Sequence, residues 1–274
     1  MPGTLSAVNQ NRCTLKEGLP RLPASLYFAA MKTSFLLLTT CALCAMLTAN
    51  AADQPLLAIP GKVIHEDKLN TQPGDPWKAA KCSWELAGGV WRCSEKPEDH
   101  HGAVIRLPDT LADFVIEYEF KFEGGRSTSL SINATKDHMA RIMITPNSVT
   151  IQKDDNDHDG PDKSAVFARF AADLRAGTWH KVRMEMVGDT MLGKVDNLVA
   201  WGSSDLFKKD RVAPGFTVGG QSVDFRNLSI REATLNPGWE KVKTTLPKPG
   251  EKIAPATGGG AAKKPAGKGG KKAK

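Results

Sequence analysis

The chain has 274 residues and a formal net charge of +7 at neutral pH, but this charge lies at its two ends. Residues 1–51 carry +3 and residues 250–274 carry +6, which leaves −2 for the segment between them. The basic balance therefore gives no support for a nucleic-acid-binding domain. The roughly 190 residues between the ends are enough for one domain with a sizeable core.

A secretory signal peptide is predicted at residues 31–51. It has a short basic start at Met31, an apolar run from Phe35 to Leu47, and an A-x-A cleavage site that ends at Ala51. The run of about 13 residues is shorter than the roughly 20 that a membrane-spanning helix needs, so no transmembrane anchor is expected. We therefore expect export to the periplasm or the cell exterior, with cleavage near Ala51.

The segments at the two ends are assigned no fold. Residues 1–30 precede a complete signal and are interpreted as an over-extended gene start or a long n-region. The end of the chain, 241–274, is rich in Lys, Gly, Pro and Ala and is expected to be a disordered tail. Its lysines could contact an anionic envelope polymer, and a solvated tail without function is the alternative.

Cys82 and Cys93 flank two short alternating runs around Gly88-Gly89, a pattern typical of a β-hairpin. They are the two of five cysteines that follow the predicted leader. An even number of cysteines in an oxidising compartment favours a disulfide across the hairpin. A zinc site would need more Cys or His at ligand spacing than this stretch offers.

Alternation of apolar and polar residues dominates residues 102–232, and in Asp113–Glu123 every second residue from Phe114 to Phe122 is apolar. Turn signals such as Gly124-Gly125 and Gly219-Gly220 separate the runs. Further strands are expected at 130–132, 142–144, 149–151, 179–187, 190–195, 198–201, 215–218 and 223–231. Many short strands, with no helix-period stretch longer than Ala165 to Leu174, predict an all-β, antiparallel two-sheet jelly-roll sandwich over residues 52–240.

The order of these segments resembles that of concanavalin A-like lectin and glucanase domains. The likeness is carried by Trp77, Trp84–Arg92, Asp113–Phe120, Gly177–Val182, Val195–Asn197 and Val223–Leu228. Residues Gly61–Ala233 resemble the 3-keto-disaccharide hydrolase domain family, formerly a domain of unknown function. This resemblance implies an exported carbohydrate-active protein that hydrolyses glycosidic bonds. A non-catalytic glycan-binding or envelope-associated sandwich is the alternative, because most of these positions are core aromatics or turns.

The alternation also predicts a polar face. If the apolar sides of the strands between residues 114 and 152 face the core, their polar side chains share the outer side. These are Glu117, Glu119, Lys121, Ser129, Ser131, Asn133, Arg141, Thr150 and Gln152. In jelly-roll lectins and glucanases a face of this kind holds sugars, so substrate binding is assigned to Ser129, Ser131, Asn133, Arg141 and Gln152. An ordinary solvated sheet face is the alternative.

Three residues are candidates for catalysis. Glu117 and Glu119 are two residues apart on one strand, so their α-carbons lie roughly 6.7 Å apart, near the carboxylate separations of glycosidases. Laminarinase-type enzymes of this fold carry E-x-D-x-E or E-x-D-x-x-E on one strand. Here Glu119 replaces the Asp, and Lys121 occupies the position of the second catalytic Glu in the regular form, which argues against a laminarinase mechanism. His138 could act as an acid–base group if the fold brings it to the polar face.

An acidic run suggests a calcium site. Asp155, Asp157, Asp159 and Gly160 fit the D-x-D-x-D-G start of a calcium-binding loop. The twelfth position is Val166 in place of the usual bidentate Glu, so the ligand set is incomplete. The sequence thus leaves open a weak calcium site and an acidic solvated loop.

Overall fold

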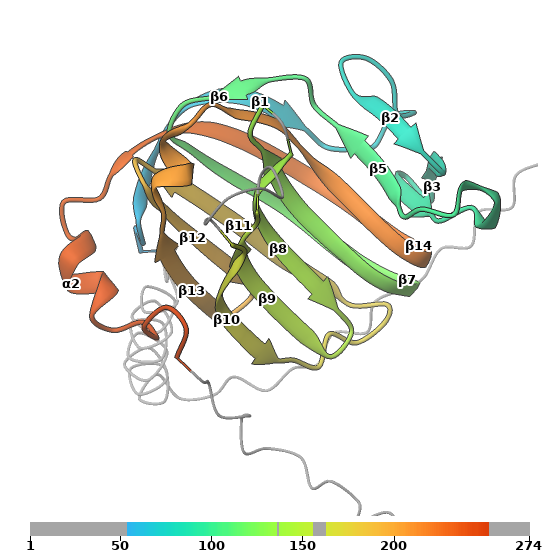
Figure 1. The fold of residues 1–274 in the computed structure, drawn as a ribbon. Helices are drawn as coiled ribbons and strands as arrows, with labels where there is room; N and C mark the ends of the chain where they lie inside the picture. Colours follow the sequence, from blue (N-terminus) through green and yellow to red (C-terminus); the bar gives the residue numbers. More distant parts are fainter. Residues whose placement is uncertain (1–53, 136, 156–162, 252–274) are drawn as a thin grey trace, which may run out of the picture. The chain divides into compact units, whose positions relative to one another are not determined.

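The computed structural model describes residues 54–135, 137–155 and 163–251 (Figure 1). Nearly all of their secondary structure is antiparallel β, which confirms the predicted jelly-roll class. The predicted signal peptide at 31–51, the segment before it and the tail from residue 252 onward lie outside the described residues. No helix among those that are described is long and apolar enough to cross a membrane.

Two long strands organise the fold. β7 (Phe114–Asn133) and β14 (Arg211–Leu235) pair antiparallel along nearly their whole length, as Figure 1 shows. On the other side of β7, its N-terminal half pairs with β11 (Trp179–Val187) and its C-terminal half pairs with β8 (His138–Thr145). The sheet therefore divides at β7 into two layers.

The first layer comprises the C-terminal half of β7, β8, β9 (Ser148–Lys153) and β10 (Ala165–Ala171). The second layer comprises the N-terminal half of β7, β11, β12 (Thr190–Val195) and β13 (Leu198–Ser203). The core lies between the layers: a Cβ built on Gly193 of β12 would lie 3.0 Å from Ile151 of β9. The apolar side of each strand thus faces the opposite layer, as the alternation predicts.

The turns predicted at Gly124-Gly125 and Gly219-Gly220 are wrong, because both glycine pairs lie inside the long strands. Gly125 is paired with Gly220, and the register shifts of the two strands gather around this pair. A Cβ on Gly125 would lie 2.5 Å from the side chain of Val223. Bulges bend strands, so both strands pass from one layer to the other at the point where side chains are absent.

The remaining elements flank the long strands. They are β1 (Ala58–Asp67), β2 (Lys78–Lys81), β3 (Ser83–Ala87), β4 (Val90–Ser94), β5 (Ala103–Arg106), β6 (Thr110–Leu111) and the 3₁₀ helices Pro97–Asp99 and Asp205–Lys208. β1, β4, β5 and β6 pair with β14, and β2 pairs with β5. The longest helix-period stretch, which begins at Ala165, forms strand β10.

The predicted hairpin is confirmed, but the predicted disulfide is not formed. β3 and β4 pair around Gly88 (φ 62°) and Gly89 (φ 78°), while Cys82 and Cys93 are both free thiols. The register places Trp84 opposite Cys93. Cys82 lies before β3 and has a φ of 66°, so the pairing of the two strands does not bring it opposite Cys93. The Cys82 thiol instead donates to the carbonyl of His101, at 3.3 Å.

The outer side of the second layer is covered over β12 and β13. The short helix α2 (Trp239–Lys243) and the segment before β1 pack there around Leu57, Leu192 of β12 and Trp239. The rings of Trp239 and Trp201 meet edge to face, with centroids 5.7 Å apart. Ordered structure therefore continues past residue 240, where the sequence predicted the domain to end.

Candidate functional site

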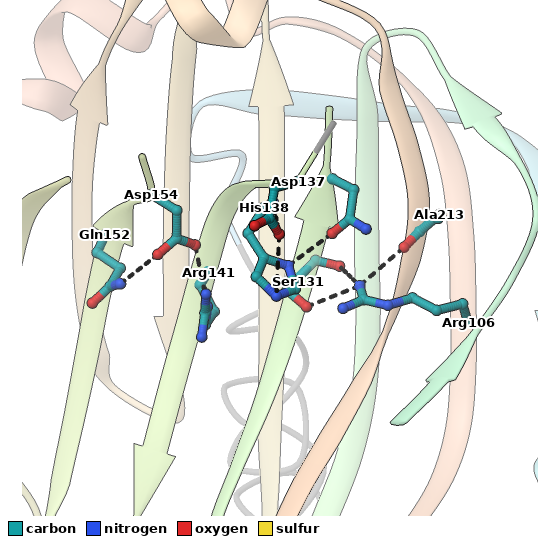
Figure 2. Close-up of polar contacts among 9 residues, drawn as sticks. Arg106, Ser131, Asp137, His138, Arg141, Gln152, Asp154 and Ala213 are labelled. Atoms are coloured by element: carbon teal, nitrogen blue, oxygen red, sulfur yellow. Dashed lines mark hydrogen bonds and ion pairs between the residues drawn. The ribbon is translucent and has the colours of Figure 1, made fainter. Parts of the chain in front are cut away.

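Five of the predicted binding and catalytic residues meet on the outer side of the first layer (Figure 2). Ser131 of β7 lies opposite Arg141 of β8, which lies opposite Gln152 of β9. Asn133 is paired with His138 at the end of the same strands. We call the group the polar cluster. It comprises Arg106, Ser131, Asn133, Asp137, His138, Arg141, Gln152 and Asp154. Ser129 lies on the same side of β7, two residues from Ser131.

Glu117 and Glu119 lie elsewhere, in the half of β7 that belongs to the second layer. Glu117 Oε1 accepts a hydrogen bond from Arg183 Nη1 at 2.9 Å. Glu119 Oε2 lies 2.5 Å from Arg226 Nη2. The fold therefore does not bring these carboxylates to His138, because the bulges at Gly124-Gly125 send the two halves of β7 into different layers.

Arg106 was not singled out from the sequence. It stands on β5, next to Gly215 of β14, which in turn lies next to Ser131 of β7. Its Nη1 donates to Ser131 Oγ at 3.0 Å and to the carbonyl of Ala213 at 3.1 Å (Figure 2). A Cβ on Gly215 would lie 2.9 Å from Arg106 Cδ, so the glycine gives the arginine room to cross the strand.

Asp154 directly precedes the acidic run at Asp155, and it fixes other members of the cluster. It directly follows β9, and its N–H donates to the carbonyl of Met139 at 3.0 Å. Its buried carboxylate accepts from Arg141 Nε at 3.1 Å and from Gln152 Nε2 at 2.7 Å. Asp154 thus fixes both side chains by charge-assisted bonds, which leaves the outer ends of Arg141 and Gln152 for other partners.

His138 is held as a neutral ring. Its Nδ1 lies 2.8 Å from Asn133 Oδ1, so we assign the proton to Nδ1. Burial lowers the pKa of His138, and the charges of Arg141 and Arg106 lower it further, against the carboxylates of Asp137 and Asp154. Nε2 is then the nitrogen with the lone pair, 3.8 Å from Asp137 Oδ1. A neutral ring of this kind can accept a hydrogen bond from a ligand hydroxyl.

The floor of the cluster consists of short hydroxyl side chains. Ser129, Ser131 and Thr150 are buried although they lie on the outer side of the layer. Longer side chains lie over them: Arg106 bonds to Ser131, and Arg169 Nε donates to Thr150 Oγ1 at 3.3 Å. Arginine, amide, imidazole and hydroxyl groups together offer donors and acceptors within one patch.

The predicted calcium ligands are only partly visible. Asp155 is described, whereas Asp157 and Asp159 lie outside the described residues. Within residues 54–135, 137–155 and 163–251, no group of three or more His, Cys, Asp or Glu side chains could hold a metal ion. Calcium binding by the loop stays a prediction.

No family model and no curated protein matches the chain, so its resemblance to 3-keto-disaccharide hydrolases also stays a prediction. Solved structures do match. A Bacillus subtilis protein of unknown function with a galectin-like fold is 10% identical, with a TM-score of 0.51 over 66% of this chain and 100% of its own. The chain has a jelly-roll fold of this galectin-like type. Its long bent strands β7 and β14 are the framework on which the polar cluster lies.

Two further structures have stated carbohydrate functions. A non-specific endo-β-1,3(4)-glucanase of family GH16, crystallised with a bound oligosaccharide, is 11% identical, with a TM-score of 0.51 over 65% of this chain and 98% of its own. Carbohydrate-binding module CBM66 from Bacillus subtilis is 16% identical, with a TM-score of 0.44 over 57% of this chain and 95% of its own. At these identities the likeness concerns the fold.

Proposed function

We propose that the chain is an exported glycan-binding protein whose ligand lies on the outer side of the first layer. The observation that carries this proposal is the polar cluster, in which Asp154 fixes Arg141 and Gln152 beside the neutral ring of His138. Sugars are bound by convergent, pre-positioned donors and acceptors, and here buried partners fix these groups. The export part of the proposal rests on the signal pattern from Met31 to Ala51.

A further observation supports this location. α2 and the segment at Leu57 cover the outer side of the second layer over β12 and β13, whereas Arg141 and His138 in the first layer keep 25% and 31% of their side chains exposed. The GH16 glucanase with the similar fold, crystallised with an oligosaccharide at its active site, supports a carbohydrate as the class of ligand.

The bonds that the candidate carboxylates already form within the chain favour binding over hydrolysis. Glycosidases place two carboxyl groups on either side of the scissile bond, roughly 5 to 9.5 Å apart. Glu117 and Glu119 are each committed to an arginine in the other layer, and Asp154 is bound by Arg141 and Gln152. These three carboxylates thus form ion pairs and hydrogen bonds within the chain, whereas a hydrolase would need an acid and a base at the scissile bond.

A glycan-binding screen of the purified chain, followed by calorimetric titration, tests the proposal. Replacing Gln152 with Ala should weaken glycan binding about tenfold, the effect of losing one hydrogen bond to the ligand. Lys181→Ala, an exposed change in the second layer, is the matched control and should bind as the wild type does.

Turnover of 3-keto-glucosides and their parent disaccharides should be measured alongside. We expect binding without turnover. If the chain hydrolyses such a substrate and Glu117→Gln abolishes this activity, hydrolysis in the second layer replaces our proposal. If no glycan binds and none is hydrolysed, the carbohydrate function itself is wrong.

A further inference from the structure

The polar cluster contains a guanidinium group without a bonded counter-ion. Within the described part of the chain, Arg106 donates hydrogen bonds only to neutral oxygens, those of Ser131 and Ala213. All of these bonds are made by Nη1, so Nε and Nη2 form no hydrogen bond with a described residue. Arg141 differs, because its Nε is bound to the carboxylate of Asp154.

This arrangement is costly for Arg106. Burial, together with the charge of Arg141, lowers its pKa to about 10, and the carboxylate of Asp137 opposes these two effects only in part. Arginine is nevertheless charged at neutral pH. A partly buried cation beside a second cation is unfavourable unless an anion joins it.

The edge of the Arg106 guanidinium that forms no hydrogen bond with a described residue consists of Nε and Nη2, and it has a specific geometry. Nε and Nη2 of a guanidinium donate two parallel hydrogen bonds, which match the two oxygens of a carboxylate. Arg106 reaches across Gly215 to Ser131 of β7, and Arg141 lies opposite Ser131 on the neighbouring strand β8. The guanidinium of Arg106 therefore lies about one strand spacing, roughly 5 Å, from strand β8 at Arg141. A carboxylate on Arg106 would therefore lie near a second positive charge.

We propose that the glycan is acidic, and that a sugar carboxylate binds the Nε–Nη2 edge of Arg106 with Arg141 as the second cation. The inference rests on the proposed function and names its ligand class: glycans that contain uronic acids. Hydroxyl groups of the same sugar then meet Gln152 and Nε2 of His138. The ligand supplies the anion that Arg106 lacks, and the buried floor of Ser131 holds the guanidinium in place.

The test compares two forms of one ligand. An oligogalacturonate and its methyl ester share a backbone and differ in charge, so their ratio of Kd values isolates the carboxylate. We expect the acid to bind the wild-type chain at least tenfold more tightly than the ester, and raising the salt concentration to reduce this preference. A sulfated oligosaccharide serves as a third ligand, and stronger binding of sulfate than of carboxylate would contradict the proposed geometry.

Variants assign the effect to Arg106. Arg106→Gln should lose the preference for the acid, and Arg106→Lys should retain only part of it, because an ammonium group cannot bind both oxygens in parallel. Arg175→Gln removes one exposed arginine charge away from the cluster and should keep the wild-type preference. Thermal unfolding of each variant checks that it is folded. The comparison of acid and ester in the wild-type chain tests the proposal even if a variant fails to fold.

The outcomes separate the two proposals. Equal binding of acid and ester, or binding of neutral glycans alone, overturns the acidic ligand but leaves glycan binding intact. Binding of no glycan at all overturns both.

Discussion

At the scale of single residues, alternation predicts which side of a strand a residue occupies but not its partners. Ser131, Asn133, Arg141 and Gln152 were predictable in this way, because neighbouring strands keep one side in common. The position of His138 was not, because a register shift of β7 and β8 pairs it with Asn133. Arg106 and Asp154 were not. Arg106 reaches the cluster through the pairing of β5 with β14, more than 100 residues later in the chain. Asp154 directly precedes an acidic run whose composition is typical of a solvated loop.

The charge of Arg141 should be measurable at His138. Arg141→Gln should raise the pKa of His138 toward its ordinary value of about 6.5, since one of the causes that lower it is removed, while burial remains. An NMR titration of the imidazole C–H signals measures this pKa. Arg175→Gln is the control and should leave it unchanged.

The same shift affects stability. With a lowered pKa, the folded chain binds fewer protons than the unfolded chain just below pH 6.5, so this contribution is present above that pH and is lost as the pH falls through the folded pKa. Arg141→Gln should reduce this part of the acid sensitivity of the melting temperature. A pKa of His138 that does not move would mean that Arg141 does not act on the ring.

At the scale of elements, the sequence predicted where most strands lie but misjudged their continuity. Strand β11 begins and ends where predicted, whereas β7 and β14 each join runs that had been assigned to separate strands. Gly-Gly is a turn signal on a single chain. Here the two Gly-Gly pairs form bulges because Gly125 and Gly220 lie opposite each other on neighbouring strands. Local sequence patterns do not show this pairing, because the two residues are far apart in the chain.

Gly215 should not tolerate a side chain. In Gly215→Ala the new Cβ would lie 2.2 Å from the carbonyl oxygen of Ile105, so the strands must separate. We expect a loss of about 1–3 kcal/mol in the free energy of unfolding, measured by urea denaturation, together with weaker glycan binding as Arg106 is displaced. Gly74→Ala is the control, because its Cβ would meet nothing closer than 3.9 Å. Equal stability of the two variants would contradict the close approach of β5 and β14.

At the scale of the whole molecule, the jelly-roll class followed from the number of alternating runs, but the cover of the second layer did not. Helix α2 has five residues, too few for a helical period to be recognised. Its role depends on Trp239, which lies against Leu192 and Trp201 from strands far earlier in the chain. This apolar cover lies over β12 and β13, and the first layer carries the polar cluster instead.

Removing that cover should destabilise the chain without altering the polar cluster. Trp239→Ala deletes a ring that is 5% exposed, and we expect a loss of about 3 kcal/mol in the free energy of unfolding. Lys241→Ala, an exposed change in the same helix, should have little effect. Below its unfolding temperature the Trp239 variant should bind glycan as the wild type does. Loss of binding in a folded Trp239 variant would show that the two layers are coupled.

The pairing of β7 with β14 also bears on how the chain is made. Since β14 follows β7 by on the order of 100 residues, one edge of β7 has no partner until nearly the whole domain has left the ribosome. Both layers contain a part of β7 and β14, so neither layer is complete before the final strand is synthesised. Such a chain acquires its native sheet late, which is compatible with the export that we propose, because an exported chain crosses the membrane before it folds.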